Sequence, residues 1–133
     1  MPGEKILLVE DDLFLHDLYR DTLTSAGYNV ISAKDGEEGL NLIKANPDAN
    51  LLLLDLMLPK LNGIDVLKEI KKDERTKSLS VIVLTNLNEE AIIQEALKLG
   101  ANAYLVKVDY TPQQVIDMVH QYIDLRSHLK QQP

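Results

Sequence analysis

The chain has 133 residues, of which 45% are hydrophobic and 26% are charged, so it is long enough for one domain with a sizeable core and too short to expect two. Its formal net charge of −7 has the wrong sign for direct binding to nucleic acid or an anionic membrane, and its lack of cysteine excludes disulfides, thiolate metal sites and thiol nucleophiles. No apolar run reaches the roughly 18 residues of a membrane span and no signal peptide is visible, so we expect a cytoplasmic location.

Five short aliphatic runs predict the strands. They are KILLV at 5–9, YNVIS at 28–32, LLLLD at 51–55, VIVLT at 81–85 and AYLVK at 103–107. Several of these runs are continuous rather than alternating, which is typical of strands that are covered on both faces in a parallel sheet.

Segments with helical periodicity follow these runs. Helices are expected at 12–26, at 36–46, around 64–70, at 89–99 and from 112 to about 126. Asp12 and Asp35 are placed to cap the first two helices. The last helix opens TPQQ at 111–114, with a cap, a proline at the first helical position and a glutamine three residues after the cap. We assign Leu97 to the inner face of the fourth helix.

Five strands that alternate with five helices over short connections predict an α/β doubly wound parallel sheet, because a barrel would need eight such units. In open sheets of this kind, ligands bind beyond the carboxyl ends of the strands, where the strand order reverses. We assign residues 1–126 to this one domain and residues 127–133 to a frayed tail or the start of a linker.

One aspartate interrupts the apolar stretch LLLLDLMLP at 51–59. This residue, Asp55, closes the third predicted strand, while Glu10 and Asp11 follow the first. Because the carboxyl ends of parallel strands meet at one edge, we expect these carboxylates to lie close together and to need protons or a cation. Oxygen ligands, few of them from the protein, favour Mg²⁺.

Thr85 and Lys107 end the fourth and fifth predicted strands at the same edge. A hydroxyl and an ammonium group beside a carboxylate and a metal ion make a site for a phosphoryl group, in which the carboxylate attacks and the other groups stabilise the phosphoryl oxygens. We choose Asp55 as the nucleophile because it stands alone on the central strand, with neighbours on both sides.

The motifs LLVEDD, LLLLDLMLPKLNG, VIVLT and GANAYLVK occur in this order along the chain. With them the chain, from about Lys5 to about Ile123, resembles the receiver domain of bacterial two-component response regulators, including the chemotaxis regulators. The resemblance implies a flavodoxin-like sheet with strand order 2-1-3-4-5. It also implies that Asp55 accepts a phosphoryl group from the phosphohistidine of a sensor histidine kinase or a histidine phosphotransfer protein.

The resemblance further implies a role for each residue of the site. Mg²⁺ would be bound by Glu10, Asp11, Asp55 and the backbone carbonyl of Met57. Lys107 and Thr85 would contact the phosphoryl group, and Thr85 and Tyr104 would be the switch residues. The chain would then catalyse only its own phosphorylation and dephosphorylation, and would not be an enzyme acting on other substrates.

The resemblance also implies the partners. The surface formed by the fourth helix, the fifth strand and the fifth helix would change on phosphorylation and meet an output protein or an output domain outside this sequence. A homodimer through the same surface is a second use of it.

Two positions depart from the family pattern. Val108 stands where a proline usually follows the lysine, so we expect a trans peptide bond there. Asn86 stands where a small residue is usual, and its amide is placed to crowd the phosphoryl group or to donate to it. These departures leave open an alternative, a pseudo-receiver that acts as a phosphorylation-independent interaction module. A more distant alternative is a Mg²⁺-dependent phosphohydrolase.

Overall fold

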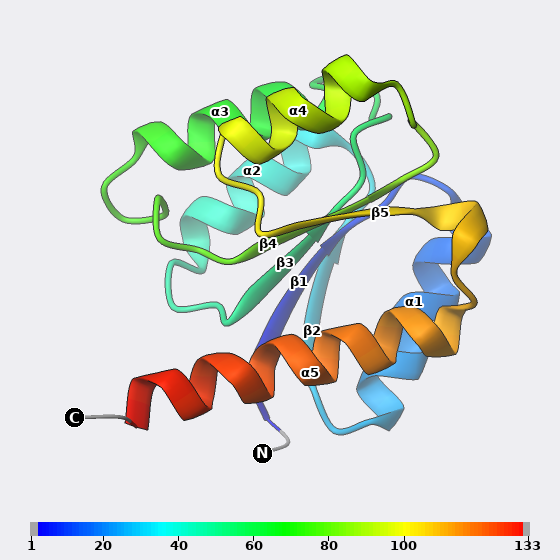
Figure 1. The fold of residues 1–133 in the computed structure, drawn as a ribbon, viewed down its shortest axis with the longest axis vertical. Coiled ribbons are helices and arrows are strands. Elements are labelled where there is room, and N and C mark those ends of the chain that lie inside the picture. The colour runs from blue at the N-terminus through cyan, green and yellow to red at the C-terminus, as the bar shows by residue number, and fades with distance from the viewer. Residues whose placement is uncertain (1–2, 132–133) are drawn as a thin grey trace.

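Five parallel strands form one sheet in the order β2-β1-β3-β4-β5, which confirms the predicted fold class (Figure 1). The computed structural model describes residues 3–131, with side chains described for residues 3–125. The elements are β1 (Lys5–Val9), α1 (Leu13–Ser25), β2 (Asn29–Ala33), α2 (Gly36–Ala45), β3 (Leu51–Leu54), α3 (Gly63–Lys72), β4 (Val81–Thr85), α4 (Glu90–Lys98), β5 (Ala103–Val106), the short 3-10 helix η1 (Lys107–Asp109) and α5 (Pro112–Gln131).

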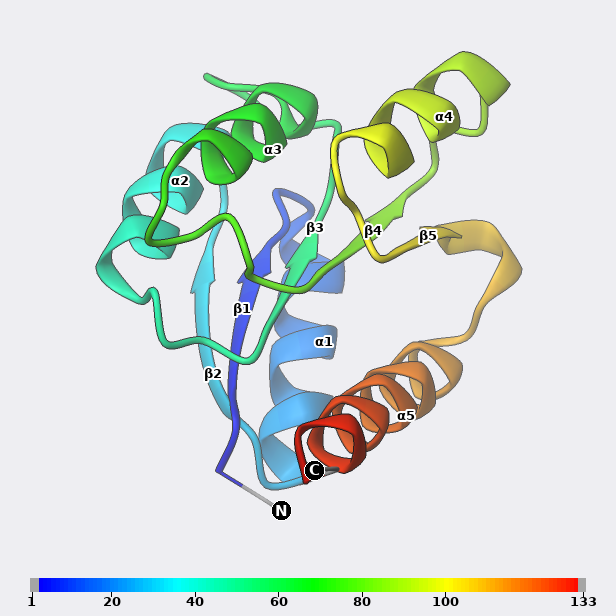
Figure 2. The same ribbon diagram turned by 60° about the vertical axis from the view of Figure 1, so that its left-hand side comes forward.

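Helices cover both faces of the sheet. Figures 1 and 2 show α2, α3 and α4 on one face and α1 and α5 on the other. The chain passes from β1 to β2 in one direction and then returns past β1 to β3, so the strand order reverses between β1 and β3. In doubly wound sheets this reversal opens a crevice at the carboxyl ends of the strands. The predicted ligand edge therefore lies where β1 and β3 end.

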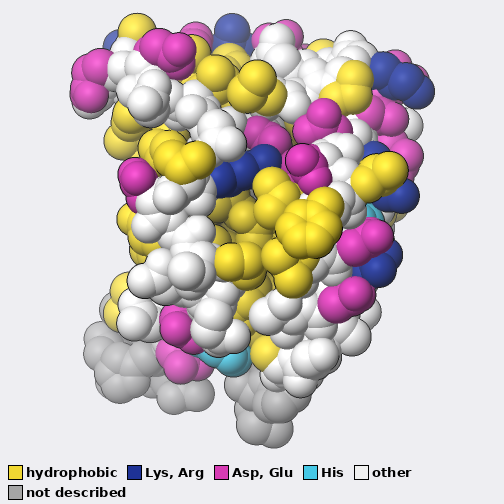
Figure 3. All heavy atoms as spheres, turned by 90° about the vertical axis from the view of Figure 1, so that its right-hand side faces the viewer, with side chains coloured by type: hydrophobic (Ala, Val, Ile, Leu, Met, Phe, Trp, Pro, Cys, Tyr) yellow, Lys and Arg dark blue, Asp and Glu magenta, His cyan; other side chains and the backbone are white. Residues whose placement is uncertain are grey.

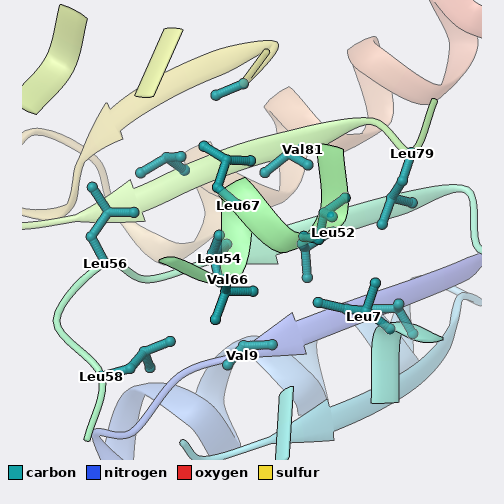
Figure 4. Packing of buried hydrophobic residues seen from close by; sticks show 14 of the residues in the cluster. Leu7, Val9, Leu52, Leu54, Leu56, Leu58, Val66, Leu67, Leu79 and Val81 are labelled. Atoms are coloured by element: carbon teal, nitrogen blue, oxygen red, sulfur yellow. The ribbon is translucent and has the colours of Figure 1, made fainter. Parts of the chain in front are cut away.

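The three central strands, β1, β3 and β4, are buried on both faces, as their continuous apolar sequences predict, whereas the edge strands β2 and β5 are only partly buried. Alternate residues of the three central strands pack against α2, α3 and α4 (Figure 4): Leu7, Val9, Leu52, Leu54, Val81 and Val83. Their neighbours pack against α1 and α5: Ile6, Leu8, Leu51, Leu53, Ile82 and Leu84. Burying each such aliphatic side chain contributes roughly 1.5–3 kcal/mol, so two aliphatic layers hold the strand ends in place.

The predicted helix starts are confirmed. The Asp12 side chain accepts a hydrogen bond from the Leu15 N–H at 3.0 Å, which caps α1. Asp35 caps α2 in the same way through the Glu38 N–H at 2.7 Å. At the start of α5, Thr111 and Gln114 exchange two hydrogen bonds of 2.8 and 3.1 Å between side chain and backbone.

The structure corrects several details of the predicted elements. The third strand ends at Leu54 and the fifth at Val106, so Asp55 and Lys107 each lie one residue beyond a strand. The second strand begins at Asn29 rather than at residue 28. Leu97 is 41% exposed because α4 turns Ala96, Ile92 and Leu99 towards the core and leaves Leu97 on the outer side. Helix α5 continues past residue 126 to Gln131, so the backbone at 127–131 is helical; residues 132–133 lie outside the described residues. The division of the chain at residue 126 stays a prediction.

In the described part of the chain, no helix combines the length and the apolar composition that crossing a membrane requires.

Candidate functional site

The carboxyl ends of β1 and β3 bring the predicted carboxylates together. The backbone ladder continues one residue beyond each strand, because the Asp55 N–H donates to the Val9 carbonyl and the Glu10 N–H donates to the Ala33 carbonyl, both at 3.1 Å. Glu10 is 1% exposed and Asp55 is 4% exposed. These two acids are therefore buried and held at fixed positions at the carboxyl edge of the sheet.

Lys107 links the two buried carboxylates. Its Nζ atom lies 2.7 Å from Oε1 of Glu10 and 2.8 Å from Oδ2 of Asp55. The remaining oxygens accept from the backbone, since Asp12 N–H donates to Oε2 of Glu10 and Met57 N–H donates to Oδ1 of Asp55, both at 3.1 Å. Figure 3 shows a basic side chain flanked by acidic ones on this end of the molecule, with hydrophobic side chains beside them.

The electrostatics of the site indicate an excess of negative charge. Burial, together with the neighbouring charge of Asp55, raises the pKa of Glu10 from 4.5 to about 7, although hydrogen bonds to Lys107 and to the backbone act against this rise. Burial by itself lowers the pKa of Lys107, but its hydrogen bonds to Asp55 and Glu10 outweigh that effect and raise the pKa above its ordinary value. The ammonium group therefore stays charged while Glu10 is close to neutralisation.

The donor set fits a divalent cation. Oxygen atoms of Glu10, Asp11 and Asp55 all lie within 4.8 Å of one another. When all three carboxylates are ionised, the single ammonium of Lys107 leaves two negative charges, which a divalent ion would balance. Hard oxygen ligands from so few protein groups suit Mg²⁺, which keeps several waters. Met57 follows this cluster in the loop after β3, and its carbonyl as a ligand stays a prediction.

Thr85 and Tyr104 both contact the loop between β4 and α4. Thr85 is buried, and its Oγ accepts a long hydrogen bond of 3.4 Å from the Leu87 N–H. The Tyr104 hydroxyl donates to the Leu87 carbonyl at 2.7 Å. Both predicted switch residues are therefore bonded to the backbone of the same residue.

The two departures from the family pattern are in contact with each other. The Val108 N–H donates to Oδ1 of Asn86 at 3.2 Å. No cis peptide bond occurs in the described residues, so the bond before Val108 is trans, as predicted. The Asn86 side-chain oxygen is thus engaged by the turn after β5. A proline at position 108 would lack the N–H that makes this contact.

The structure brings Glu10, Asp11, Asp55 and Lys107 into one cluster, and it bonds Thr85 and Tyr104 to the backbone of Leu87. The roles of these residues, and of the Met57 carbonyl, stay predictions. Two relationships were not predicted: the second ion pair of Lys107, with Glu10, and the hydrogen bond between Asn86 and Val108. The second had a signal in the sequence, because Asn86 follows β4 directly, Val108 lies two residues after the neighbouring strand β5, and both residues depart from the family pattern.

The strand order and the acidic carboxyl edge define a flavodoxin-like fold of the kind that receiver domains have. The chain belongs to the response regulator family, since the family model for the response regulator receiver domain matches residues 6–120.

Known relatives agree with this membership. The chain is 36% identical over 110 residues to the chemotaxis protein CheY1 of Helicobacter pylori (strain ATCC 700392 / 26695), covering 82% of this chain and 88% of that protein. It is 47% identical over 103 residues to the transcriptional regulatory protein CpxR of Escherichia coli (strain K12), covering 77% of this chain and 42% of CpxR. Among solved structures, the CheX–CheY–BeF3–Mg²⁺ complex from Borrelia burgdorferi matches with a TM-score of 0.81 and 29% identity, covering 91% of this chain and 90% of that one.

Proposed function

We propose that this chain is a phospho-accepting receiver in two-component signal transduction, with Asp55 as the acceptor. The observation that carries the proposal is the contact between Lys107 and Asp55 at 2.8 Å within the acidic cluster at the carboxyl edge. A buried carboxylate that is held by an ammonium group, with two further carboxylates beside it, has both a nucleophile and the charges that phosphoryl transfer requires. The similarity to a CheY complex that contains BeF3 and Mg²⁺ supports this assignment.

The transfer follows from the chemistry of these groups. A carboxylate oxygen of Asp55 attacks the phosphorus of a phosphohistidine, an acyl–oxygen–phosphorus bond forms, and the phosphorus–nitrogen bond breaks, so that the imidazole leaves with its electron pair. The Lys107 ammonium and the Thr85 hydroxyl stabilise the charge on the phosphoryl oxygens. Mg²⁺ held by Glu10, Asp11, Asp55 and the Met57 carbonyl would neutralise further charge when bound.

The response is a population shift between two arrangements of one surface. Thr85 and Tyr104 both hydrogen-bond to the backbone of Leu87. When the Thr85 hydroxyl turns to donate to a phosphoryl group, its bond to Leu87 is lost and the β4–α4 loop changes position. That change reaches the surface formed by α4, β5 and α5, which meets an output protein or an output domain. A homodimer through this surface would be a second way of using it.

The proposed phosphoryl transfer takes place in the cytoplasm, and the phosphoryl donor is a sensor histidine kinase or a histidine phosphotransfer protein. The chain catalyses only its own phosphorylation and dephosphorylation. The membership of the receiver family and the similarity to a CheX–CheY complex support protein partners of this kind.

The test is a direct measurement of phosphorylation. The chain is incubated with Mg²⁺ and acetyl phosphate and weighed by intact mass spectrometry, beside Asp55→Asn and the matched control Asp117→Asn, which changes an exposed aspartate of α5. We expect one phosphoryl gain in the parent and in the Asp117 variant, none in the Asp55 variant, and none after chelation of the metal.

The opposite result would favour the alternatives. If the parent gains no mass and beryllium fluoride with Mg²⁺ leaves its NMR spectrum unchanged, the chain is a pseudo-receiver that binds partners without phosphorylation. Steady turnover of a chromogenic phosphate ester would instead indicate a phosphohydrolase.

A further inference from the structure

Two loops at the carboxyl edge are joined by one side chain beyond the end of the sheet. The last pair of residues in register between β4 and β5 is Thr85 with Val106. After it, β4 runs into the loop at 86–89 and β5 turns into η1. Asn86 spans the resulting gap, because its Oδ1 accepts a hydrogen bond of 3.2 Å from the Val108 N–H.

Each partner of this hydrogen bond is next in sequence to a residue that is predicted to contact the phosphoryl group. Asn86 directly follows Thr85, and Val108 directly follows Lys107. The Val108 side chain is 78% exposed and Asn86 is also exposed, so water would satisfy both groups if the bond broke. The contact therefore contributes only modestly to net stability, and any coupling that it transmits between the two loops is of the same modest size.

We propose that Asn86 is a positioning residue that couples the turn carrying Lys107 to the loop that begins directly after Thr85. This inference rests on the proposed function, since it concerns the two residues that would contact the phosphoryl group. Without this hydrogen bond, the β4–α4 loop and the turn at 107–109 would move independently when Thr85 and Lys107 contact the phosphoryl group. With it, the loop and the turn move together.

The neighbouring hydrogen bonds show how the coupling would work. The bond from Leu87 N–H to Thr85 Oγ is 3.4 Å long and is easily given up when the hydroxyl turns to a phosphoryl oxygen. The Leu87 carbonyl remains bonded to Tyr104 at 2.7 Å. When the Leu87–Thr85 bond is lost, the backbone at residue 86 moves. The Asn86 side chain passes this movement to Val108, and the turn passes it on to the start of α5.

A different role for Asn86 is direct donation from its amide nitrogen to the phosphoryl group. The two roles need different atoms, and variants separate them. Asn86→Asp keeps the oxygen acceptor and loses the donor, whereas Val108→Pro deletes the N–H partner and leaves Asn86 intact. Asn86→Ala removes both atoms. Asn88→Ala is the matched control, because Asn88 is an exposed asparagine of the same loop.

The experiment follows backbone amide shifts while beryllium fluoride and Mg²⁺ are added to each variant. In the parent we expect shifts at Leu87 in the β4–α4 loop and also at Asp109 and Tyr110 in the turn. In Asn86→Ala and in Val108→Pro, we expect the Leu87 shift to remain and the Asp109 and Tyr110 shifts to fall by at least about half. Asn88→Ala should keep both sets of shifts, and Asn86→Asp should keep them at saturation, which needs more beryllium fluoride because the added carboxylate repels the anion.

A kinetic cycle gives a second measurement. The rate of phosphorylation by phosphoramidate should fall roughly threefold in Asn86→Ala and in Val108→Pro, and the double variant should be no slower than the slower single variant. Mg²⁺ affinity, measured by NMR titration, should not change, because the predicted metal ligands lie after β1 and β3. Folding of each variant is checked by the dispersion of its NMR spectrum.

Each outcome separates the two proposals. If the parent binds neither beryllium fluoride nor a phosphoryl group, the proposed function fails and the coupling fails with it. If the parent responds but Asn86→Ala transmits the full shift to Asp109 and Tyr110, only the coupling is overturned. Loss of the response in Asn86→Asp together with its retention in Val108→Pro would assign Asn86 to direct donation instead.

Discussion

The Nζ atom of Lys107 lies 2.8 Å from Oδ2 of Asp55, a residue 52 positions earlier in the chain. The same ammonium group also pairs with Glu10 at 2.7 Å. One positive charge is thus shared between two buried carboxylates, with Asp11 beside them. Without a cation, the folded protein bears the repulsion among these acids, so the site reduces stability in the state that is ready to bind metal.

Removing one carboxylate should therefore stabilise the metal-free protein. We expect Asp55→Asn to raise the free energy of unfolding by about 1 kcal/mol at pH 8, and Lys107→Met to lower it by about 2 kcal/mol because two buried carboxylates lose their counter-ion. Urea unfolding with and without Mg²⁺ measures both effects. If Asp55→Asn is less stable than the parent without Mg²⁺, this account of the site is wrong.

The raised pKa of Glu10 predicts how stability depends on pH. Its pKa is about 7 in the folded protein against a reference value of 4.5, so between these pH values the folded state binds more protons than the unfolded state. Stability from this group is therefore lost as the pH rises from 4.5 to 7, by at most about 1.4 kcal/mol per pH unit. Urea unfolding across this range measures the slope. The slope should disappear in Glu10→Gln and shrink with saturating Mg²⁺; an equal slope in the variant would assign it to other groups.

Apolar side chains near the acceptor predict a slowly hydrolysed acyl phosphate. Met57 is 55% exposed two residues after Asp55, and Leu87 is two residues after Thr85. A polar side chain at either position would help an attacking water, so we expect Met57→Asn and Leu87→Glu to speed dephosphorylation roughly tenfold. Intact mass spectrometry after removal of the donor measures the decay. Leu97→Glu on the exposed side of α4 is the control, and unchanged decay in both site variants would contradict the prediction.

The start of α3 is packed against the acceptor. A side chain at Gly63 would clash with the backbone of Asp55 and Leu56, and the Gly63 N–H donates to the Leu56 carbonyl at 3.0 Å. We expect Gly63→Ala to lower the free energy of unfolding by about 2–4 kcal/mol and to slow phosphorylation, because relief of the clash must move the acceptor strand. Asn62→Ala, which deletes only the α3 cap, should cost about 1 kcal/mol. Urea unfolding measures the stability of the two variants, and the rate of mass gain measures their phosphorylation. If both variants change stability and rate equally, the packing of Gly63 against Asp55 has no effect on phosphorylation.

Local patterns predicted most of the elements, and the errors have physical causes. Continuous aliphatic runs indicated strands that are buried on both faces, and Asp12, Asp35 and Thr111 each cap a helix as expected. Leu97 was assigned to the wrong side because helical periodicity alone does not say which residues at the edge of an apolar stripe reach the sheet. The end of α5 was predicted too early, since the mostly polar sequence at 126–131 lacks the apolar periodicity by which a helix is recognised.

By itself the sequence determined the alternation of strands and helices, the acidic carboxyl edge, and the carboxylates and the lysine that meet there. The reason is that the order and direction of the strands bring these positions of the chain to one edge. Only the tertiary structure decided that Lys107 bonds to Glu10 as well as Asp55, that the pKa of Glu10 rises, and that Asn86 bonds to Val108. These features depend on distances of a few ångströms and on burial, which arise when segments far apart in the chain pack together.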